Sequence, residues 1–233
     1  RLIAMQTIPG LPSTLPVRRL ELKYDYMSRR VRKEVFQPTA APATDDGGKD
    51  GGSGGITGDN GDDGPGGGVA PYGWTSTGIT RFIWDGWNLL GEISDTNQVI
   101  RTYTWGLDLS GSEQGAGGIG GLVFQQDGLG NIYHAIYDGN GNLMRLRHGA
   151  GSLWADYEYG PFGEILIARG TGVLNNPVRF STKYADAETG LLYYGLRYYN
   201  AGCGRWTSRD PIAESGDANV FGFCSNAPIS LID

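Results

Sequence analysis

Histidine and cysteine, the residue types that most often do chemistry in proteins, are scarce in this chain. His134 and His148 are its two histidines, and Cys203 and Cys224 are its two cysteines. Neither pair has the further Cys, His or acidic residues at ligand spacing that a zinc site needs. We therefore expect no metal site, no cofactor and no histidine-assisted nucleophile. Two unpaired structural thiols are expected, although the spacing leaves a Cys203–Cys224 disulfide open.

Two glycine-rich stretches resemble ligand-binding loops in composition. The run "DNGDD" at 59–63 offers oxygen ligands for calcium, but it has neither a repeated nonapeptide nor the spacing of an EF-hand. The run "GAGGIGG" at 115–121 lacks the strand–turn–helix context and the lysine of a phosphate loop. We interpret the first as part of a solvated acidic loop and the second as a structural insertion.

The charge and hydrophobicity of the chain exclude two classes of partner. With 19 Lys and Arg against 25 Asp and Glu, the net charge is −6, whereas a phosphate-binding surface is basic. We expect no nucleic-acid partner. No run of 18 apolar residues is present, so no membrane span is expected. The start "RLIAMQTIPG" has neither an initiator Met nor a signal-peptide pattern, which indicates a piece of a longer protein.

The elements that must position any functional residue are mostly β-strands. Residues 40–78 are expected to form a flexible linker, because the Gly, Asp and Ser residues in this stretch bury too little surface to offset their ordering entropy. On either side, strands end in an aromatic residue followed by an Asp or Asn turn and a second alternating strand. Trp84 and Trp105, and likewise Tyr137 and Tyr157, recur at a period near 20 residues, which favours a stacked hairpin array.

Several motifs carry a family resemblance. "YDYMSRR", "WDGWNLLGE", "YDGNGNL" and "YEYGPFGE" resemble the tyrosine–aspartate (YD) repeats of Rhs proteins, Tc-toxin C components and teneurins. The stretch from Arg179 to Pro211 resembles the Rhs repeat-associated core domain that closes such arrays. Its matching positions are Phe180, Lys183, Tyr184, Asp186, Glu188, Thr189, Gly190, Leu191, Tyr193, Tyr194, Arg197, Tyr198, Tyr199, Gly204, Arg205, Trp206, Ser208, Asp210 and Pro211.

The resemblance implies a mostly β architecture in which stacked YD-repeat hairpins form part of a spiralling β shell and a core segment folds inward. The implied divisions are 1–39, a partial YD-repeat hairpin region; 40–78, the Gly/Asp-rich flexible linker, expected to be disordered; 79–170, YD-repeat β-hairpins; and 171–233, the core. Family shells enclose or present a C-terminal toxin or effector domain. The implied partners are that domain, the remaining shell, and secretion-system or surface components. The implied location is bacterial, secreted or at the cell surface.

The resemblance also implies a reaction. Many family members cut themselves after the core, at Asp-Pro-x-Gly-Leu, in a reaction thought to resemble that of aspartic proteases, in which two carboxylates share a proton. The corresponding residues here are Asp210 and Asp233 as catalytic carboxylates and Arg209 as an orienting cation. Two departures weaken the match, because "DPIAESG" replaces the Asp-Pro-Ile-Gly pattern and the bond to be cut lies beyond Asp233.

Three functions are therefore compared. The first is a structural shell, the second a single-turnover aspartic self-protease, and the third a cell-surface module that binds carbohydrate or mediates adhesion through exposed aromatic rings. The exposure of Trp84, Trp87, Trp105 and Trp154 separates the first from the third, because stacked hairpins would leave these rings half-buried.

Overall fold

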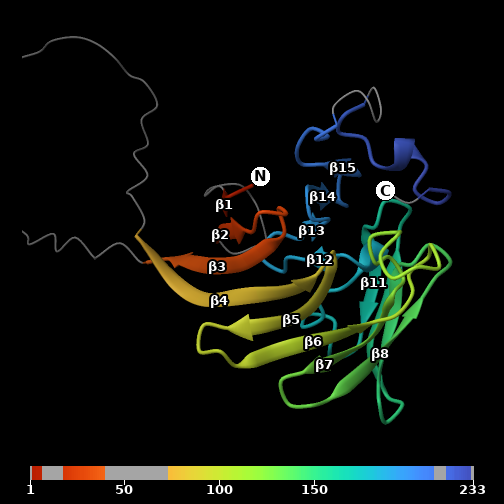
Figure 1. Cartoon of the computed structure of the whole chain (residues 1–233), viewed down its shortest axis with the longest axis horizontal. Helices are drawn as coiled ribbons and strands as arrows, with labels where there is room; N and C mark the ends of the chain where they lie inside the picture. The colour runs from red at the N-terminus through yellow and green to blue at the C-terminus, as the bar shows by residue number, and fades with distance from the viewer. Residues whose placement is uncertain (1, 7–17, 40–72, 213–218, 232–233) are drawn as a thin grey trace, which may run out of the picture.

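The computed structural model describes residues 2–6, 18–39, 73–212 and 219–231, which form two antiparallel sheets (Figure 1). In this part of the chain there is no α-helix, only 3₁₀ turns such as Phe180–Thr182 and Cys224–Asn226. No helix there is long and apolar enough to cross a membrane. The larger sheet contains β1 (Ala4–Gln6), β2 (Arg19–Tyr24), β3 (Arg30–Pro38), β4 (Trp74–Asp85), β5 (Asn88–Ser94), β6 (Val99–Trp105), β7 (Leu122–Asp127), β8 (Ile132–Tyr137), β9 (Leu143–His148), β10 (Leu153–Tyr159) and β11 (Ile165–Arg169).

Each strand of this sheet pairs with the next along the chain, so the order in space is the order in sequence. The expected hairpin array and the mostly β fold are confirmed. Strands β3 and β4 pair directly although residues 40–72 separate them in sequence, with Val35 opposite Gly78. The linker was expected to run to residue 78, but β4 begins at Trp74. After Trp74 its first residues, "TSTG", are polar or small, and pairing with β3 rather than burial makes them a strand.

The recurring aromatic residue at the end of every second strand has a specific contact. Its ring nitrogen or hydroxyl donates a hydrogen bond to a main-chain carbonyl at or near the start of the preceding strand, which satisfies the polar end of a ring whose body is buried. The five pairs are Tyr24 with Leu2, Trp84 with Arg30, Trp105 with Leu89, Tyr137 with Leu122 and Tyr159 with Leu143, at 2.7 to 2.9 Å.

The aspartate of the hairpin motif closes the turn that follows. The Oδ1 atom of Asp138 accepts hydrogen bonds from the main-chain N–H groups of Asn140 and Asn142, both at 2.9 Å. Asp25 and Asp127 bind the N–H groups of their own turns in the same way. Side chains that bond to main-chain N–H groups a few residues ahead fix turn geometry. The aromatic–aspartate pair therefore anchors one strand and starts the next.

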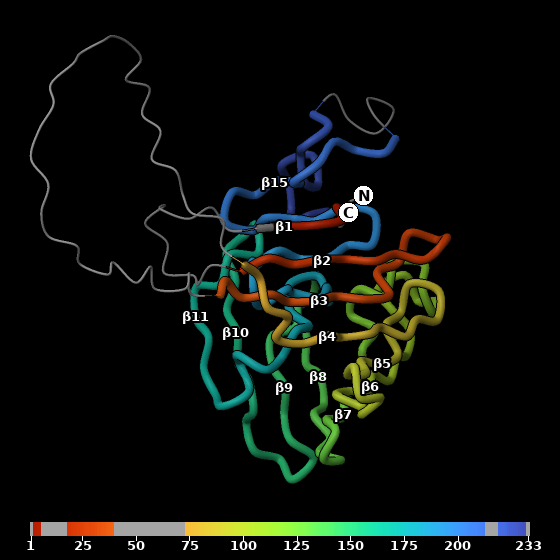
Figure 2. The backbone as a smooth tube through the Cα atoms, turned by 90° about the vertical axis from the view of Figure 1, so that its left-hand side faces the viewer, coloured from red at the N-terminus to blue at the C-terminus, as the bar shows by residue number. Residues whose placement is uncertain are grey.

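The remaining chain, residues 171–212 and 219–231, is here called the core segment. It carries the second sheet, β12 (Tyr184–Ala185), β13 (Leu192–Tyr193), β14 (Tyr198–Asn200) and β15 (Arg205–Trp206). Figures 1 and 2 show the large sheet curling so that β12 and β13 lie against its concave side. A turn joins β12 and β13 at residues 186–190, where the main-chain N–H groups of Thr189 and Gly190 bond to the Asp186 carbonyl.

Two buried polar clusters tie the core segment to the sheet. Arg30, at the start of β3, forms an ion pair with Asp186, and Lys33 of the same strand reaches the other carboxylate oxygen at 3.1 Å. In the second cluster, Glu92 of β5 accepts a hydrogen bond from the Tyr184 hydroxyl at 3.0 Å and another from the Tyr103 hydroxyl. Both clusters give the buried carboxylates partners that burial would otherwise deny them.

Candidate active site

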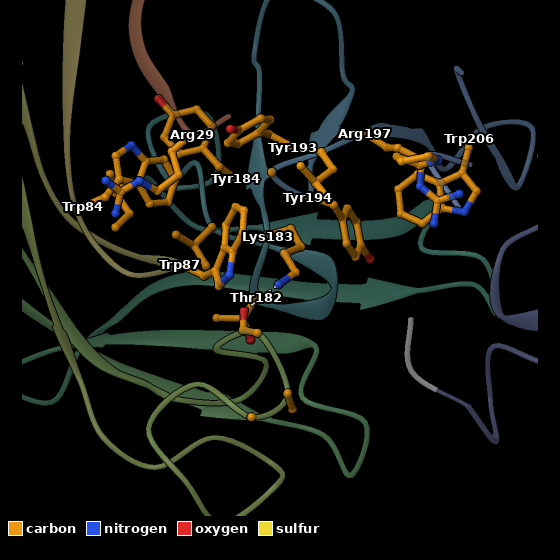
Figure 3. A pocket seen from close by; sticks show the side chains of 18 of the residues that line it. Arg29, Trp84, Trp87, Thr182, Lys183, Tyr184, Tyr193, Tyr194, Arg197 and Trp206 are labelled. Carbon is orange, nitrogen blue, oxygen red and sulfur yellow. Dashed lines mark hydrogen bonds between the residues drawn. The ribbon is translucent and has the colours of Figure 1, made fainter. Parts of the chain in front are cut away.

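A cavity of about 600 Å³ lies between the core segment and the end of the sheet that carries the turns after β2 and β4. Figure 3 shows its lining side chains converging from the core segment and from β4 with its following turn. Residues 115–117 of the insertion between β6 and β7 form part of its wall. The lining combines seven aromatic side chains, Trp84, Trp87, Trp105, Tyr184, Tyr193, Tyr194 and Trp206, with four charged ones, Arg29, Lys183, Arg197 and Asp210.

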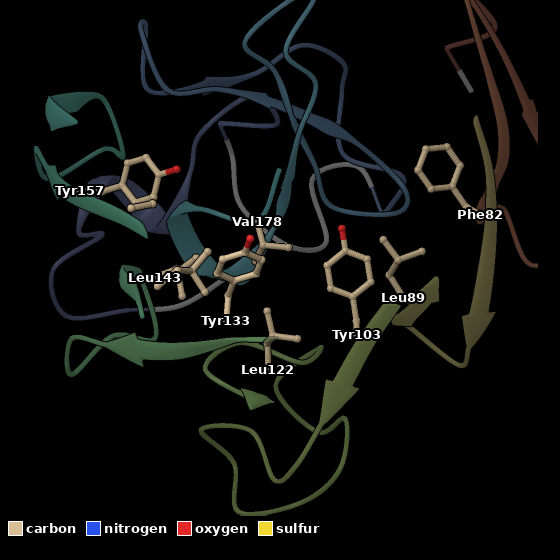
Figure 4. Packing of buried hydrophobic residues seen from close by; sticks show 10 residues of the cluster. Phe82, Leu89, Tyr103, Leu122, Tyr133, Leu143, Tyr157 and Val178 are labelled. Atoms are coloured by element: carbon tan, nitrogen blue, oxygen red, sulfur yellow. The ribbon is translucent and has the colours of Figure 1, made fainter. Parts of the chain in front are cut away.

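The concave side next to this cavity is filled, and Leu89 and Val178 belong both to the filling and to the cavity wall. Figure 4 shows Leu89, Tyr103, Leu122 and Tyr133 pointing from the sheet toward Val178 of the core segment. These residues belong to one buried apolar cluster that runs from β4 to β10. The cavity is therefore a local feature at the rim of the core, next to charged groups, rather than a gap in its centre.

Asp210, a predicted catalytic residue, lies at this cavity and is held in place on both sides. Its Oδ2 atom lies 2.7 Å from Nη1 of Arg197, and its Oδ1 atom accepts a hydrogen bond from the main-chain N–H of Ile212 at 2.9 Å. Its own main-chain N–H donates to the Val220 carbonyl at 3.0 Å. One-fifth of its side chain is exposed to solvent. The carboxylate is thus oriented and remains accessible.

The cation that pairs with Asp210 is Arg197, a matching position of the core domain for which no role in the reaction was expected. Arg209 was expected to orient a carboxylate, and its side chain is exposed. Arg197 precedes β14, and its guanidinium carbon lies 3.9 Å from the centre of the Trp206 ring. The sequence signal for this contact is the position of Arg197 directly before two tyrosines in an aromatic-rich segment, because arginine often stacks on aromatic rings. Asp233 lies outside the described residues.

Lys183 brings a second cation to the cavity. Its Nζ atom donates to the Gly117 carbonyl at 2.7 Å and lies 5.3 Å from the centre of the Tyr194 ring. This contact attaches the glycine-rich insertion to the core segment. A lysine bound in this way also contributes positive charge to the cavity that Asp210 lines.

The glycine-rich insertion itself is organised around Asp108. That carboxylate accepts main-chain N–H groups from Ser110, Ala116 and Gly118, at 2.9, 2.7 and 3.1 Å. Burial raises the pKa of Asp108, and the hydrogen bonds led by those from Ser110 outweigh this effect and lower it. The N–H groups that a phosphate would need are occupied by the loop's own aspartate. The insertion therefore acts as a wall of the cavity.

The histidines and cysteines lie in strands and turns without forming a site. His134 packs edge-on against Phe124, and His148 Nδ1 accepts the main-chain N–H of Ala150. Cys203 is exposed, Cys224 is buried, and no disulfide joins them. Within the described ranges, no cluster of three or more His, Cys, Asp or Glu side chains is arranged to hold a metal ion.

Three of the four tryptophans that distinguish a shell from an adhesion surface are half-buried. Trp84, Trp105 and Trp154 fall in this class, whereas Trp87 is 38% exposed. The ring of Trp87 lies so close to Gly195 that a Cβ added at this glycine would approach it to 2.8 Å. Even the most exposed of the four therefore bridges the sheet and the core segment.

No family model matches the chain, but individual proteins do. The chain is 30% identical over 165 residues to the double-stranded DNA deaminase toxin A of Burkholderia cenocepacia, a match that covers 66% of this chain and 11% of that protein. It is 40% identical over 88 residues to the toxin subunit YenC1 of Yersinia entomophaga, over 36% of this chain and 9% of the relative. A 57-residue match to toxin protein Tse5 of Pseudomonas aeruginosa is also 40% identical and covers 24% of this chain and 4% of that one.

Solved structures share the fold. The crystal structure of TcdB2-TccC3-TEV matches 99% of this chain with a TM-score of 0.60 at 17% identity, over 9% of that chain. The Photorhabdus luminescens Tc holotoxin pore matches 99% with a TM-score of 0.59, again over 9%. At this level of identity the likeness concerns the fold alone. In every case the chain spans a small part of a much longer protein.

Proposed function

This chain belongs to the Rhs/YD-repeat family, and on that premise we propose that it is the C-terminal part of a β shell that encloses a toxin domain encoded further along the same polypeptide. The observation that carries the proposal is the curl of one continuous sheet around an inward-folded core segment. The partners in this proposal are the toxin domain and the remaining repeats of the shell. The proposed setting is export to the cell surface or beyond.

The edges of the sheet support this role. In the described part of the chain, β1 and β11 each pair with a strand on one side only. Unpaired edges recruit further strands, and natural proteins cover or pair them. Additional hairpins of the same type could pair with β1 and continue the array with the same strand pairing. Hairpins along the sheet repeat the same aromatic contact, so a further hairpin would add to the sheet in the same way.

The buried ties of the core segment also support it. A wall that holds a toxin apart from its surroundings needs a closed, rigid end. The ion pair of Arg30 with Asp186 and the hydrogen bonds of Glu92 anchor the core segment at two separate strands of the sheet. Such pairs are costly to open, because opening leaves buried charge unpaired.

Protection from proteolysis tests the enclosure. The full-length protein, carrying a C-terminal epitope tag, is digested with thermolysin alongside its separately expressed C-terminal domain. We expect the tagged domain in the full-length protein to survive at least tenfold longer and to become sensitive only when the shell unfolds. Equal digestion rates for the two would contradict enclosure.

A second candidate function is self-cleavage by Asp210 and Asp233, and the placement of Asp210 favours it. An oriented, partly exposed carboxylate paired to an arginine at the rim of a cavity is suited to act on a peptide bond brought beside it. Asp233 and Arg209 remain proposed members of this site. Intact mass spectrometry of the full-length protein and of its Asp210→Asn variant provides the test. We expect two fragments from the first and one uncut chain from the second.

The carbohydrate-binding alternative has less support. Stacking on sugars needs ring faces open to solvent, and three of the four relevant tryptophans are half-buried. Two of these, Trp84 and Trp105, use their ring N–H groups to bind main-chain carbonyls of neighbouring strands. The positions of these two rings are therefore explained by contacts within the sheet, without a bound sugar.

A further inference from the structure

In the described part of the large sheet, every hairpin whose first strand ends in a recurring aromatic residue contains one residue without a Cα partner across that hairpin. In the hairpin of β2 and β3, Tyr24 pairs with Arg30 and Lys23 pairs with Arg32, so Val31 between them is left over. The other four hairpins show the same shift. Their extra residues are Leu90 in β5, Val123 in β7, Met144 in β9 and Leu166 in β11.

The extra residue always occupies the same place. It lies in the second strand of the hairpin, directly after the residue that pairs with the aromatic one, as Leu90 follows the partner of Trp84 and Val123 follows the partner of Trp105. One unmatched residue in an antiparallel pair is a β-bulge, which bends the bulged strand and increases its right-handed twist. Because the bulges repeat on the same strand at the same height, their bends have one direction and add along the sheet.

The burial pattern of the second strands shows the same extra length. Neighbouring residues of a strand face opposite sides of a sheet, so a single residue separates two buried positions in a regular strand. Here two residues separate them, because Leu122 and Gln125 are the buried pair in β7 and Leu143 and Leu146 the buried pair in β9. The same spacing holds for Arg30 and Lys33 in β3 and for Leu89 and Glu92 in β5. The bulge therefore lengthens the strand between two side chains that both stay buried.

The side chains of the extra residues contribute little to the core. Leu90 is 40% exposed, Val123 47% and Leu166 65%. What the five positions share is therefore the added length of backbone. Two other strand pairs of the sheet, β1 with β2 and β7 with β8, have no such shift in register.

We infer that the extra residue of each hairpin sets the curvature of the shell wall, and with it the width of the space that the wall encloses. This inference rests on the shell function proposed above. The curl of the large sheet around the core segment is the part of this curvature that Figures 1 and 2 show. Bulges are a known means of bending sheets. A hairpin without the extra residue would add a flatter step to the wall, and its second strand would have one residue instead of two between its buried positions.

Deletion of the extra residues tests this role in the full-length protein, whose wall can be followed by cryo-electron microscopy. Leu90, Val123 and Met144 are deleted together. Each deletion restores strict alternation to its strand, so the remaining side chains keep their faces. We expect the wall from β4 to β10 to become flatter and the separation of these two strands to increase.

A matched control keeps the added backbone and changes only the side chains. The variant carrying Leu90→Ser, Val123→Ser and Met144→Ser has the same number of residues in every strand. We expect its wall to follow the path of the unmodified protein. A control as flat as the deletion variant would assign the curvature to these side chains and overturn the inference.

The remaining outcomes are also decisive. A deletion variant that folds with the wall unchanged would overturn the inference. If the deletion variant does not fold, the map of the unmodified protein decides, because the wall should bend more at the pairs β6–β7 and β8–β9 than at β7–β8, which has no bulge. Equal bends at the three pairs would contradict the inference. A flattened deletion variant together with equal thermolysin digestion of the enclosed and free toxin domains would retain the curvature role and remove the enclosure.

Discussion

Arg30 of β3 and Asp186 of the core segment form an ion pair of 2.5 Å in which neither side chain is exposed to solvent. The guanidinium also lies 4.6 to 5.0 Å from the ring centres of Phe82, Tyr184 and Tyr193. A cation enclosed by three ring faces and one carboxylate is stabilised by all four, and because neither side chain is exposed, bulk solvent does not compete with these contacts. The pair therefore connects the sheet to the core segment at a point where breaking the contact is expected to lower the free energy of unfolding strongly.

Removing the cation should destabilise the fold strongly. Arg30→Met leaves Asp186 with Lys33 as its remaining ionic contact, and breaking a buried pair typically costs about 3–5 kcal/mol. The matched control is Arg32→Ala, which removes a more exposed pair with Glu34 on the same strand and should cost at most about 1 kcal/mol. Urea denaturation followed by tryptophan fluorescence measures both. Equal losses for the two variants would show that burial of the Arg30 pair is not what matters.

Acid should weaken the same connection. Burial alone would raise the pKa of Asp186, but the charges of Arg30 and Lys33 outweigh it and hold this pKa below its usual range. A depressed carboxyl pKa contributes stability that is complete above the unfolded value, near pH 3.9, and that is lost as the pH falls through the folded value. We expect stability to be flat near neutral pH and to fall below about pH 4.

Asp186→Asn separates this group from the other carboxylates in the acid transition. The variant should be less stable than the unmodified chain at pH 7, and the gap between the two should narrow as the pH falls. Urea midpoints measured from pH 7 to pH 2.5 give the comparison. A gap that stays constant over this range would rule out Asp186 as a contributor to acid unfolding.

The hairpins could be predicted because their signals are local. Tyr137 and Asp138 are adjacent in sequence, and each makes its contact within one hairpin or its neighbour. The Arg30–Asp186 pair spans 156 residues, and although both residues lie in motifs that the sequence shows, nothing in those motifs pairs one with the other. The ion pair of Arg197 with Asp210 was missed for a related reason, since Arg209, the neighbour of Asp210 in sequence, was the expected partner. Contacts that depend on how the core segment folds back onto the sheet leave no local pattern.

The aromatic anchors of the hairpins should each contribute a measurable hydrogen bond. Tyr137→Phe and Tyr159→Phe keep the buried ring but leave the Leu122 and Leu143 carbonyls without their hydroxyl donors. We expect each to lose about 1 kcal/mol of unfolding free energy. Tyr26→Phe is the control, since Tyr26 is 87% exposed, and it should change stability little. Anchored and exposed variants that behave alike would argue against the repeated contact as a source of stability.

The turn after β8 contains two glycines that should respond in opposite directions to alanine. Gly141 has φ of +72°, and a Cβ added there would lie 2.5 Å from Cγ2 of Ile119 and 3.0 Å from the main-chain nitrogen of Gly120. Its carbonyl also accepts a hydrogen bond from Thr182 of the core segment at 2.8 Å. Gly141→Ala should therefore cost at least 1–2 kcal/mol, the usual penalty of a left-handed alanine, with the close contacts adding to it.

Gly139, two residues earlier in the same turn, has no atom within 4 Å of an added Cβ and no positive φ. Gly139→Ala should leave stability unchanged or raise it by up to about 1 kcal/mol, because alanine restricts the unfolded chain more than glycine does. Thermal denaturation of the two variants side by side decides the matter. If Gly141→Ala proved as stable as Gly139→Ala, the turn would be able to shift away from the insertion and the core segment, and its contact with Thr182 would not be rigid.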